Sequence, residues 1–451
     1  IKHQYDSVLG RPKALEYPNG LTLEYRYNDQ GYLTHTRNAV SHYTYREVTA
    51  MADTGQITGA KLANNLMAQT SHFNRDAGTM SYTTVDKGAV TLHGHHYNLS
   101  GSYDEYLNLR KESNSLTGLQ KTYDYDNLNR LTTYTVSNTA PAVNLSVNYA
   151  YDAVGNLLKK SDYSANHDSA YQYGGSANCP AANKAGPNAL CRLEKLNSTI
   201  VQFSYDGRGN LINGDGLTLT YNALDKPLTI IGRGPGNNTN TAFTYGSDGM
   251  RAKQTRTVSG NTTTTYYVDK LFEMDNDGSW RAYIDDIAVL SWTPEQQHKL
   301  LYTLRDRLGS ATTLVNQDGQ VTSRRYFDPF GRTSSASGSE HLSNTQFSDL
   351  LATNRYRRGF TDHEHLNEQQ LIHMNGRVYD FNVGRFMSVD PLIQAPTSTQ
   401  SINPYSYIMN NPLAGTDPTG YCATTDNAQD CVDGIEDGES TPITDEDGKA
   451  V

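Results

Sequence analysis

Two aspartates that each precede a proline, Asp390 and Asp417, are candidates for acid–base chemistry in this chain. Two carboxyls held close together cannot both ionise, so they share one proton. Such a pair can activate a water molecule while protonating the nitrogen of a leaving amide. The residues alone favour a simpler interpretation, because Asp-Pro pairs commonly form turns. Chemistry here therefore depends on a fold that brings the two side chains together.

Three other short motifs contain residue types used in catalysis or metal binding. Asp53–Gly55 matches the triplet around the active aspartates of pepsin-like proteases, but it occurs once and is also a common turn. The histidine clusters at His93–His96 and Asp362–His365 would place alternate histidines on one face of a strand. Neither has H-E-x-x-H spacing or an identifiable third ligand, so we expect structural hairpins, with no metal and no cofactor. The glycine-rich stretch 232–236 is not followed by a helical pattern, which indicates a hairpin tip instead of a phosphate cradle.

Cysteines and charge limit the possible partners. Four cysteines fall into two local pairs, Cys179/Cys191 and Cys422/Cys431. Either pair could form a disulfide in an oxidising compartment, and neither has the C-x-x-C spacing of a metal site. The net charge is −10, of which residues 422–451 carry −8, so residues 1–421 are near neutral. A near-neutral shell has no positive electrostatic field that would attract nucleic acid. No run of about 18 apolar residues exists that could span a membrane.

The composition indicates which elements must position these residues. The chain of 451 residues contains 37 Gly, 15 Pro and 32 Tyr, with 36% hydrophobic and 19% charged residues. Gly, Thr, Asn, Asp and Tyr favour strands and turns over helix interiors. So many aromatic side chains can also bury area that a disordered coil would leave exposed. We predict an all-β protein.

A tyrosine followed by an acid or amide, and then by glycine or asparagine, recurs along the chain at spacings that include 22 and 26 residues. Each unit predicts a β-hairpin, in which the aspartate binds N–H groups of the turn and the glycine takes a positive φ. Single hairpins are not stable alone, so they must stack into a long sheet, which will curl. A propeller or β-helix is the alternative and would need a different period. The copies begin at Tyr5, Tyr27, Tyr103, Tyr125, Tyr151 and Tyr205, with weaker ones at Tyr221 and Tyr245.

These units resemble the YD repeats of the Rhs family, which are shared with the C component of Tc toxins and with teneurins. The resemblance implies hairpins that spiral into a hollow β-cocoon, here a partial one. It divides the chain into a YD-repeat shell over 1–299, an Rhs repeat-associated core domain with an autoprotease over 300–421, and the start of a variable C-terminal region over 422–451. The segments that resemble the core domain include Asp306-Arg-Leu-Gly-Ser310, Tyr326-Phe-Asp-Pro-Phe-Gly331, Met374-Asn-Gly-Arg-Val-Tyr-Asp380 and Gly384-Arg-Phe-Met-Ser-Val-Asp-Pro391.

The resemblance also implies a self-cleavage site. The partner of Asp417 is implied to be Asp390, and Arg385 would lower the pKa of a neighbouring carboxyl if packed against it. Cleavage would fall between Tyr421 and Cys422, where leucine is the more familiar residue before the cut. The family motif of proline, four residues, Asp-Pro-x-Gly and a hydrophobic residue is met here by Pro412, Asp417, Pro418, Gly420 and Tyr421.

The function that the resemblance implies is the encapsulation and delivery of a toxin. The shell would hold its own C-terminal toxin polypeptide as cargo, release it by cleavage, and be secreted or delivered with a secretion spike or a Tc toxin B-type component. The alternative is a non-cleaving cell-surface shell that binds carbohydrate or another cell. The motif Pro412–Tyr421, which a pure adhesin does not need, favours the first function.

The two ends of the sequence carry further expectations. The chain opens at Ile1 without methionine, and the β pattern is already present at Tyr5, so we expect more of the shell before it. Residues 422–451 contain nine acidic side chains against one lysine and few apolar ones. We therefore predict no folded domain after Tyr421.

Overall fold

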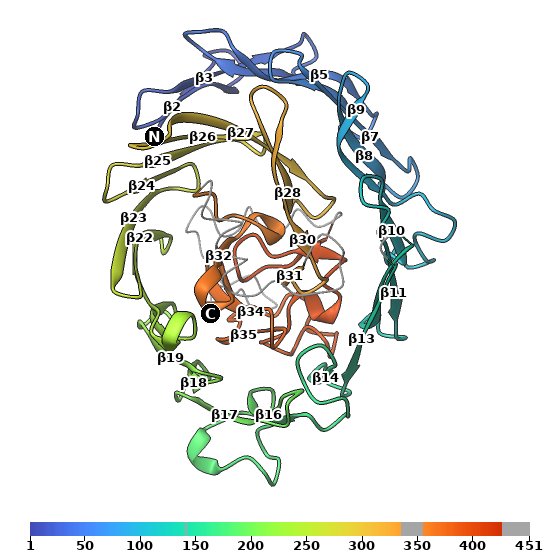
Figure 1. Ribbon diagram of the computed structural model, residues 1–451, viewed down its shortest axis with the longest axis vertical. Helices are drawn as coiled ribbons and strands as arrows, with labels where there is room; N and C mark the ends of the chain where they lie inside the picture. The colour runs from blue at the N-terminus through green and yellow to red at the C-terminus, as the bar shows by residue number, and fades with distance from the viewer. Residues whose placement is uncertain (140–141, 335–354, 426–451) are drawn as a thin grey trace, which may run out of the picture.

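The computed structural model describes residues 1–139, 142–334 and 355–425 (Figure 1). Within these ranges the chain consists of strands, turns and short 3-10 helices, without an α-helix. Strands β1–β14 form one antiparallel sheet and β15–β29 form a second, and in each sheet every strand pairs with the next one along the chain. The all-β prediction is confirmed. We call these two sheets the wall.

The first sheet contains β1 (Lys2–Tyr5), β2 (Pro12–Glu16), β3 (Thr22–Tyr27), β4 (Leu33–Asn38), β5 (Thr44–Met51), β6 (Ile57–Leu62), β7 (Met67–Phe73), β8 (Met80–Lys87), β9 (Val90–His96), β10 (Lys111–Asn114), β11 (Gln120–Tyr125), β12 (Leu131–Thr139), β13 (Ala142–Tyr151) and β14 (Leu157–Lys160).

The second sheet contains β15 (Tyr171–Tyr173), β16 (Leu190–Glu194), β17 (Ile200–Tyr205), β18 (Leu211–Gly214), β19 (Leu217–Tyr221), β20 (Pro227–Gly232), β21 (Asn240–Tyr245), β22 (Arg251–Val258), β23 (Asn261–Val268), β24 (Phe272–Asp275), β25 (Trp280–Ile284), β26 (Ala288–Thr293), β27 (Gln297–Arg305), β28 (Ala311–Asn316) and β29 (Val321–Arg324). Two 3-10 helices lie in its loops, η1 (Ala181–Asn183) and η2 (Pro235–Asn237).

The remaining elements are short and lie inside the ring that the wall forms, where Figure 1 draws them in orange and red. We call this part the inner core. Its elements are β30 (Tyr326–Phe327), β31 (Thr333–Ser334), η3 (Phe360–Asp362), β32 (Glu364–Leu366), η4 (Asn367–Gln369), β33 (Leu371–Met374), β34 (Arg377–Asp380), β35 (Arg385–Phe386), η5 (Ile408–Asn410), β36 (Gly415–Thr416) and β37 (Thr424–Thr425).

The unit at Tyr151 has the predicted hairpin geometry. Asp152 Oδ1 accepts the backbone N–H groups of Val154 at 3.0 Å and Asn156 at 2.8 Å, and Gly155 has a φ of +79°. The strand register shifts by one residue at the tyrosine, which is a β-bulge that increases the local twist of the sheet. Bulges at the same position of other units therefore help the wall to curl.

The tyrosine of most units also ties its hairpin to the one before it. The Tyr151 hydroxyl donates to the Leu131 carbonyl at 2.8 Å, and a neutral hydrogen bond of this kind is worth about 1 kcal/mol. Phenylalanine could not make this bond, so this position of the unit favours tyrosine. The same bond joins Tyr27 to Pro12, Tyr103 to Met80, Tyr125 to Leu109, Tyr173 to Leu157, Tyr205 to Leu190 and Tyr245 to Pro227.

The wall curves until its last strands lie inside its first strands (Figure 1). The Tyr17 hydroxyl donates to the Tyr283 carbonyl, and the Tyr25 hydroxyl donates to Asp285 at 3.0 Å. Among the described strands, the two large sheets are not joined to each other by strand pairing, so this closure rests on side-chain packing. The apolar cluster between the overlapping strands includes Leu15, Leu23, Tyr45, Ala282, Ile284, Tyr302 and Val315.

The inner core is fixed to the wall by a shared apolar cluster and by buried ion pairs. The Phe330 ring lies 5.1 Å from that of Tyr149, and Arg233 of the wall pairs with Asp380 at 2.7 Å. The wall continues to Arg324, so the boundary between residues 299 and 300 stays a prediction.

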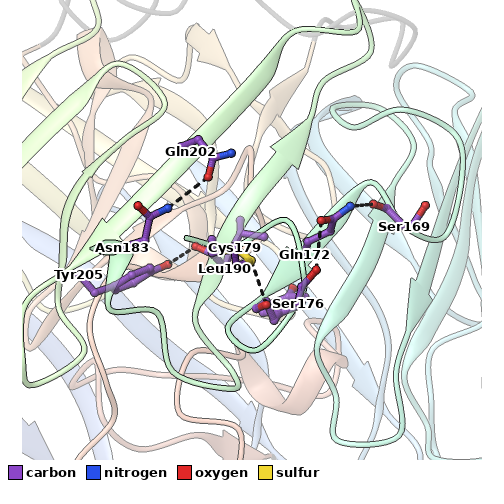
Figure 2. Close-up of a disulfide and its surroundings, with 10 residues drawn as sticks. Ser169, Gln172, Ser176, Cys179, Asn183, Leu190, Gln202 and Tyr205 are labelled. Carbon is purple, nitrogen blue, oxygen red and sulfur yellow. Dashed lines mark hydrogen bonds between the residues drawn. A yellow bond between two sulfur atoms is a disulfide. The ribbon is translucent and has the colours of Figure 1, made fainter. Parts of the chain in front are cut away.

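Cys179 and Cys191 form a disulfide with a Cα–Cα distance of 5.7 Å (Figure 2). It closes the loop between β15 and β16, and Asn183 of this loop donates to Gln202 of β17 at 3.2 Å. Of the two pairs that could form a disulfide, Cys179/Cys191 is therefore bonded. Cys431 of the other pair lies outside the described residues, as does most of the region 422–451.

Candidate functional site

The predicted cleavage motif lies beside the β33–β34 hairpin of the inner core. At the turn of this hairpin, Asn375 Nδ2 donates to the Pro418 carbonyl at 2.7 Å, and the Gly376 N–H donates to the Thr419 carbonyl at 2.8 Å. The short strands β36 and β37 pair across the motif, with Thr416 opposite Thr424. The segment 417–423 is therefore held as a loop between two paired strands.

Two glycines are required where this loop meets the hairpin. Gly420 has a φ of +78°, and a Cβ atom at this position would lie 2.0 Å from the Met374 carbonyl oxygen. A Cβ atom at Gly376 would lie 2.4 Å from the Tyr421 ring. The loop can reach its position only because both side chains are absent.

The structure brings Asp390 and Asp417 to one guanidinium, that of Arg377. Arg377 Nη2 lies 2.8 Å from Asp390 Oδ2 and 3.3 Å from Asp417 Oδ2. The exposed fractions of the three side chains are 2% for Arg377, 17% for Asp390 and 4% for Asp417. The two carboxyls therefore share one buried cation.

Asp417 also contacts the predicted scissile bond directly. Its Oδ1 accepts the backbone N–H of Cys422 at 2.9 Å, so one carboxyl oxygen lies at the nitrogen that cleavage would release. On the other side of this bond, the Tyr421 hydroxyl donates to the Gly376 carbonyl at 3.0 Å. Both residues that flank the bond are thus held in place.

Arg377 is the functional candidate that sequence reasoning missed. Besides the two aspartates, it donates to the Pro404 carbonyl at 3.0 Å and to the Gly420 carbonyl. Its guanidinium lies 3.6 Å from the centre of the Phe386 ring. The signal available in the sequence was the core-domain segment Met374–Asp380, in which Arg377 follows a turn glycine.

The surroundings of the pair raise the pKa of Asp390 to about 6. Burial is the main cause, the positive charge of Arg377 acts in the opposite direction, and the charge of Asp417 raises the pKa further. Nearby His363 is buried, which lowers the pKa of its imidazole to about 4. At neutral pH the site is therefore two carboxyls and one arginine, with a neutral histidine beside them.

Arg385 lies next to this site without a hydrogen bond or ion pair to either aspartate in the described structure. It donates to the Tyr173 hydroxyl at 3.2 Å, the Asn188 carbonyl at 2.7 Å and Asn403 Oδ1 at 3.2 Å. Asn188 belongs to the loop that the disulfide closes, so Arg385 joins that loop to Asn403. Its predicted effect on a carboxyl pKa stays a prediction.

A small cavity borders the pair. Its volume is about 30 Å³, which exceeds the space that one water molecule needs. A water molecule there would have polar neighbours on several sides, which is the condition for holding it. The lining includes Arg377, Asp390, Asn403, Ser406 and Asp417.

The other motifs singled out in the sequence have ordinary structural surroundings. Asp53–Gly55 lies at the tip of the β5–β6 hairpin, where Asp53 pairs with Arg75 at 3.1 Å and both side chains are exposed. His93 is buried between Thr313 and the Arg305 carbonyl, and His363 bonds to Thr361. Within the described ranges, no three or more His, Cys, Asp or Glu side chains are grouped to hold a metal, and no helix is long and apolar enough to cross a membrane.

Comparison with known proteins assigns this architecture to a family. The family model of the teneurin YD-shell matches residues 77–413, about three quarters of the sequence. The chain therefore belongs to the teneurin YD-shell family, and the resemblance to YD-repeat proteins is confirmed.

Three relatives show how far the similarity extends. Salivary gland surface protein 1 of Aedes aegypti is 31% identical over 130 residues, which are 29% of this chain and 3% of that protein. The crystal structure of TcdB2-TccC3-TEV matches with a TM-score of 0.69 and 16% identity over 93% of this chain and 21% of the solved one. The Photorhabdus luminescens Tc holotoxin pore with a TccC3 mutation matches with a TM-score of 0.69 and 16% identity over 94% of this chain and 21% of that one. This chain thus spans about a fifth of the solved chains, and the structural likeness shows a shared fold, so the prediction of a partial YD shell is confirmed.

Proposed function

We propose that this chain is part of a toxin-encapsulating shell that cuts its own backbone between Tyr421 and Cys422 by means of Asp390 and Asp417. The observation that carries the proposal is the contact of 2.9 Å between Asp417 Oδ1 and the Cys422 nitrogen. The turn aspartate Asp152 binds N–H groups two and four residues further on. Asp417 binds the N–H five residues further on, which is the amide that the cleavage motif designates, and it lies beside a second carboxyl.

The reaction needs only water and the single proton that the two carboxyls share. The ionised carboxyl takes a proton from water as the water oxygen attacks the carbonyl carbon of Tyr421. The C–N bond then breaks, and the carboxyl that carried the shared proton from the start gives it to the Cys422 nitrogen. One water molecule is consumed, a carboxylic acid forms at Tyr421, an amine forms at Cys422, and the pair again holds one proton. The contact of Asp417 with the Cys422 N–H suits it to the second step, in which the shared proton passes to that nitrogen.

Arg377 would allow this chemistry to run in a buried site. Two buried carboxyls with one charge between them need a cation, because an unpaired buried charge is costly. The same guanidinium holds the Gly420 carbonyl, one residue before the tyrosine whose bond is cut. We assign Arg377 a positioning role, in which it keeps the acid, the base and the substrate segment together.

The position of the segment inside the ring supports the shell part of the proposal. The cleavage motif belongs to the inner core, which the wall surrounds in Figure 1. A polypeptide released at Cys422 would therefore begin within the wall, where a cargo toxin would be kept from the cell that makes it. Its partners would be that cargo and a Tc toxin B-type component or a secretion spike, and the shell would be secreted or delivered to target cells.

Intact-mass spectrometry of the purified chain tests the proposal. We expect a break between Tyr421 and Cys422 in the parent chain and an intact Asp417→Asn chain. Asp206→Asn is the matched control, because Asp206 is a turn aspartate that bonds to Asn210 in the same way as other units. An intact parent chain over pH 5–8, or cleavage in Asp417→Asn, would contradict self-cleavage and favour the non-cleaving adhesive shell.

A further inference from the structure

One side chain of the wall reaches the residue that precedes the proposed cut. Lys226 follows the YD turn at Tyr221, where its N–H donates to Asn222 Oδ1 at 3.0 Å, and it lies directly before β20. Its ammonium nitrogen is 5.3 Å from the centre of the Tyr421 ring and 5.6 Å from the centre of the Tyr245 ring. The cation therefore lies between an aromatic ring of the wall and one of the cleavage segment.

The aromatic rings are the main partners of this cation. Among the described residues, no carboxylate lies within 4 Å of the Lys226 ammonium. Asp248 attracts it from a longer distance, and partial burial lowers the pKa of the lysine. A partly desolvated ammonium over an aromatic face is held by the ring's negative π surface, and this attraction strengthens as water is removed.

The hydroxyl of Tyr421 makes a second contact. The hydroxyl donates to the Gly376 carbonyl at 3.0 Å, and the absence of a side chain at Gly376 provides the room for the ring. Phenylalanine would keep the ring face for Lys226 and lose the hydrogen bond. Leucine would lose both interactions and also the contact of the ring with the Arg377 guanidinium, which lies 5.8 Å from the ring centre.

We propose that Lys226 determines the side-chain specificity of the self-cleavage, by selecting an aromatic residue at position 421. A residue of the wall would thus recognise the side chain that precedes the cut. Tyrosine replaces the leucine typical of the family motif because this shell provides the Lys226 ammonium for its ring and the Gly376 carbonyl for its hydroxyl. This inference rests on the proposed self-cleavage and names the recognition element of that same site.

The test compares three residues at position 421 in two backgrounds. In the parent background we expect cleavage rates in the order Tyr421, Tyr421→Phe, Tyr421→Leu. Lys226→Met should slow cleavage of the tyrosine and phenylalanine chains about five- to thirty-fold, the loss expected when a partly buried cation–π contact is removed. It should leave the rate of the Tyr421→Leu chain unchanged.

Lys253→Met is the matched control. Lys253 lies 5.9 Å from the Tyr266 ring in the neighbouring part of the wall, so this variant removes a contact of the same kind away from the site. Its cleavage rates should equal those of the parent. Equal slowing of the tyrosine and leucine chains by Lys226→Met would show a structural role and overturn the proposal.

A second readout does not depend on cleavage. In the Asp417→Asn chain, we expect Lys226→Met to speed hydrogen exchange of the amides around Tyr421, and to have no such effect when Tyr421→Leu is also present. Exchange that is unchanged by Lys226→Met would overturn the proposal. If the parent chain did not cleave but the exchange depended on both residues, the recognition would stand and the self-cleavage would fail.

Discussion

Replacement of Arg377 tests whether one guanidinium holds the cleavage site together. In Arg377→Met, Asp390 and Asp417 remain buried and lose the cation that lies 2.8 and 3.3 Å away. Removal of one partner of a buried ion pair costs about 3–5 kcal/mol, because the charge that remains is uncompensated. We expect the free energy of unfolding to fall by about this amount. The pKa of Asp390 should also rise, since the charge of Arg377 is the largest influence that lowers it.

A conservative variant separates geometry from charge. Lysine at this position keeps a positive charge but has one nitrogen, which cannot contact two carboxyls and two backbone carbonyls at once. We expect Arg377→Lys to fold and to cleave about 100-fold more slowly, the usual penalty for misplacing reacting groups by about 1 Å. The rate is measured by densitometry of the two fragments over time, and stability by urea unfolding of the Asp417→Asn background.

Arg281 provides the matched control, because it is a buried arginine of the wall that pairs with Glu273 at 2.8 Å and Asp275 at 2.9 Å. Arg281→Met should lower stability to a similar extent and leave the cleavage rate of the folded chain unchanged. Parent-like cleavage in Arg377→Lys would refute the positioning role. Equal slowing in Arg281→Met would show that the rate follows overall stability.

Four further predictions follow from the structure. Gly420→Ala should abolish cleavage, because its Cβ would lie 2.0 Å from the Met374 carbonyl; a gel that shows normal fragments would contradict this. The cleavage rate should fall as the pH rises through about 6, where Asp390 loses its proton, and a flat profile from pH 5 to 8 would contradict the shared proton. Because the folded state raises this pKa, the contribution of Asp390 to stability should be full below pH 3.8 and be lost as the pH rises through about 6. Cys179→Ser should lower the thermal midpoint, since the disulfide to Cys191 spans 12 residues and is worth about 3 kcal/mol; an unchanged midpoint would show that the loop is ordered without it.

The repeat could be predicted from the sequence because each hairpin is determined locally. Asp152 binds N–H groups two and four residues further on, so the turn can be recognised within one unit. Closure of the ring could be predicted only as a tendency to curl. Tyr17 meets Tyr283 across 266 residues of sequence, and no local pattern specifies which strands of the wall overlap.

The site could be predicted from the sequence only in part. Asp390 and Asp417 were found through the family motif, whereas Arg377 lies 40 residues before Asp417 and reaches it only because the β33–β34 hairpin lies against the cleavage loop. The arginine nearest to Asp390 in sequence, Arg385, was the natural candidate for a supporting role. Its strand instead directs it to Tyr173 of the wall.

Intact-mass spectrometry of the parent and Asp417→Asn chains, with sequencing of the released fragment, shows whether the chain cuts itself after Tyr421. We expect a parent chain split in two, with a new N-terminus at Cys422 and a new carboxyl group at Tyr421, and a single intact Asp417→Asn chain. A parent chain that stays whole, or a fragment that begins at any other residue, would contradict it.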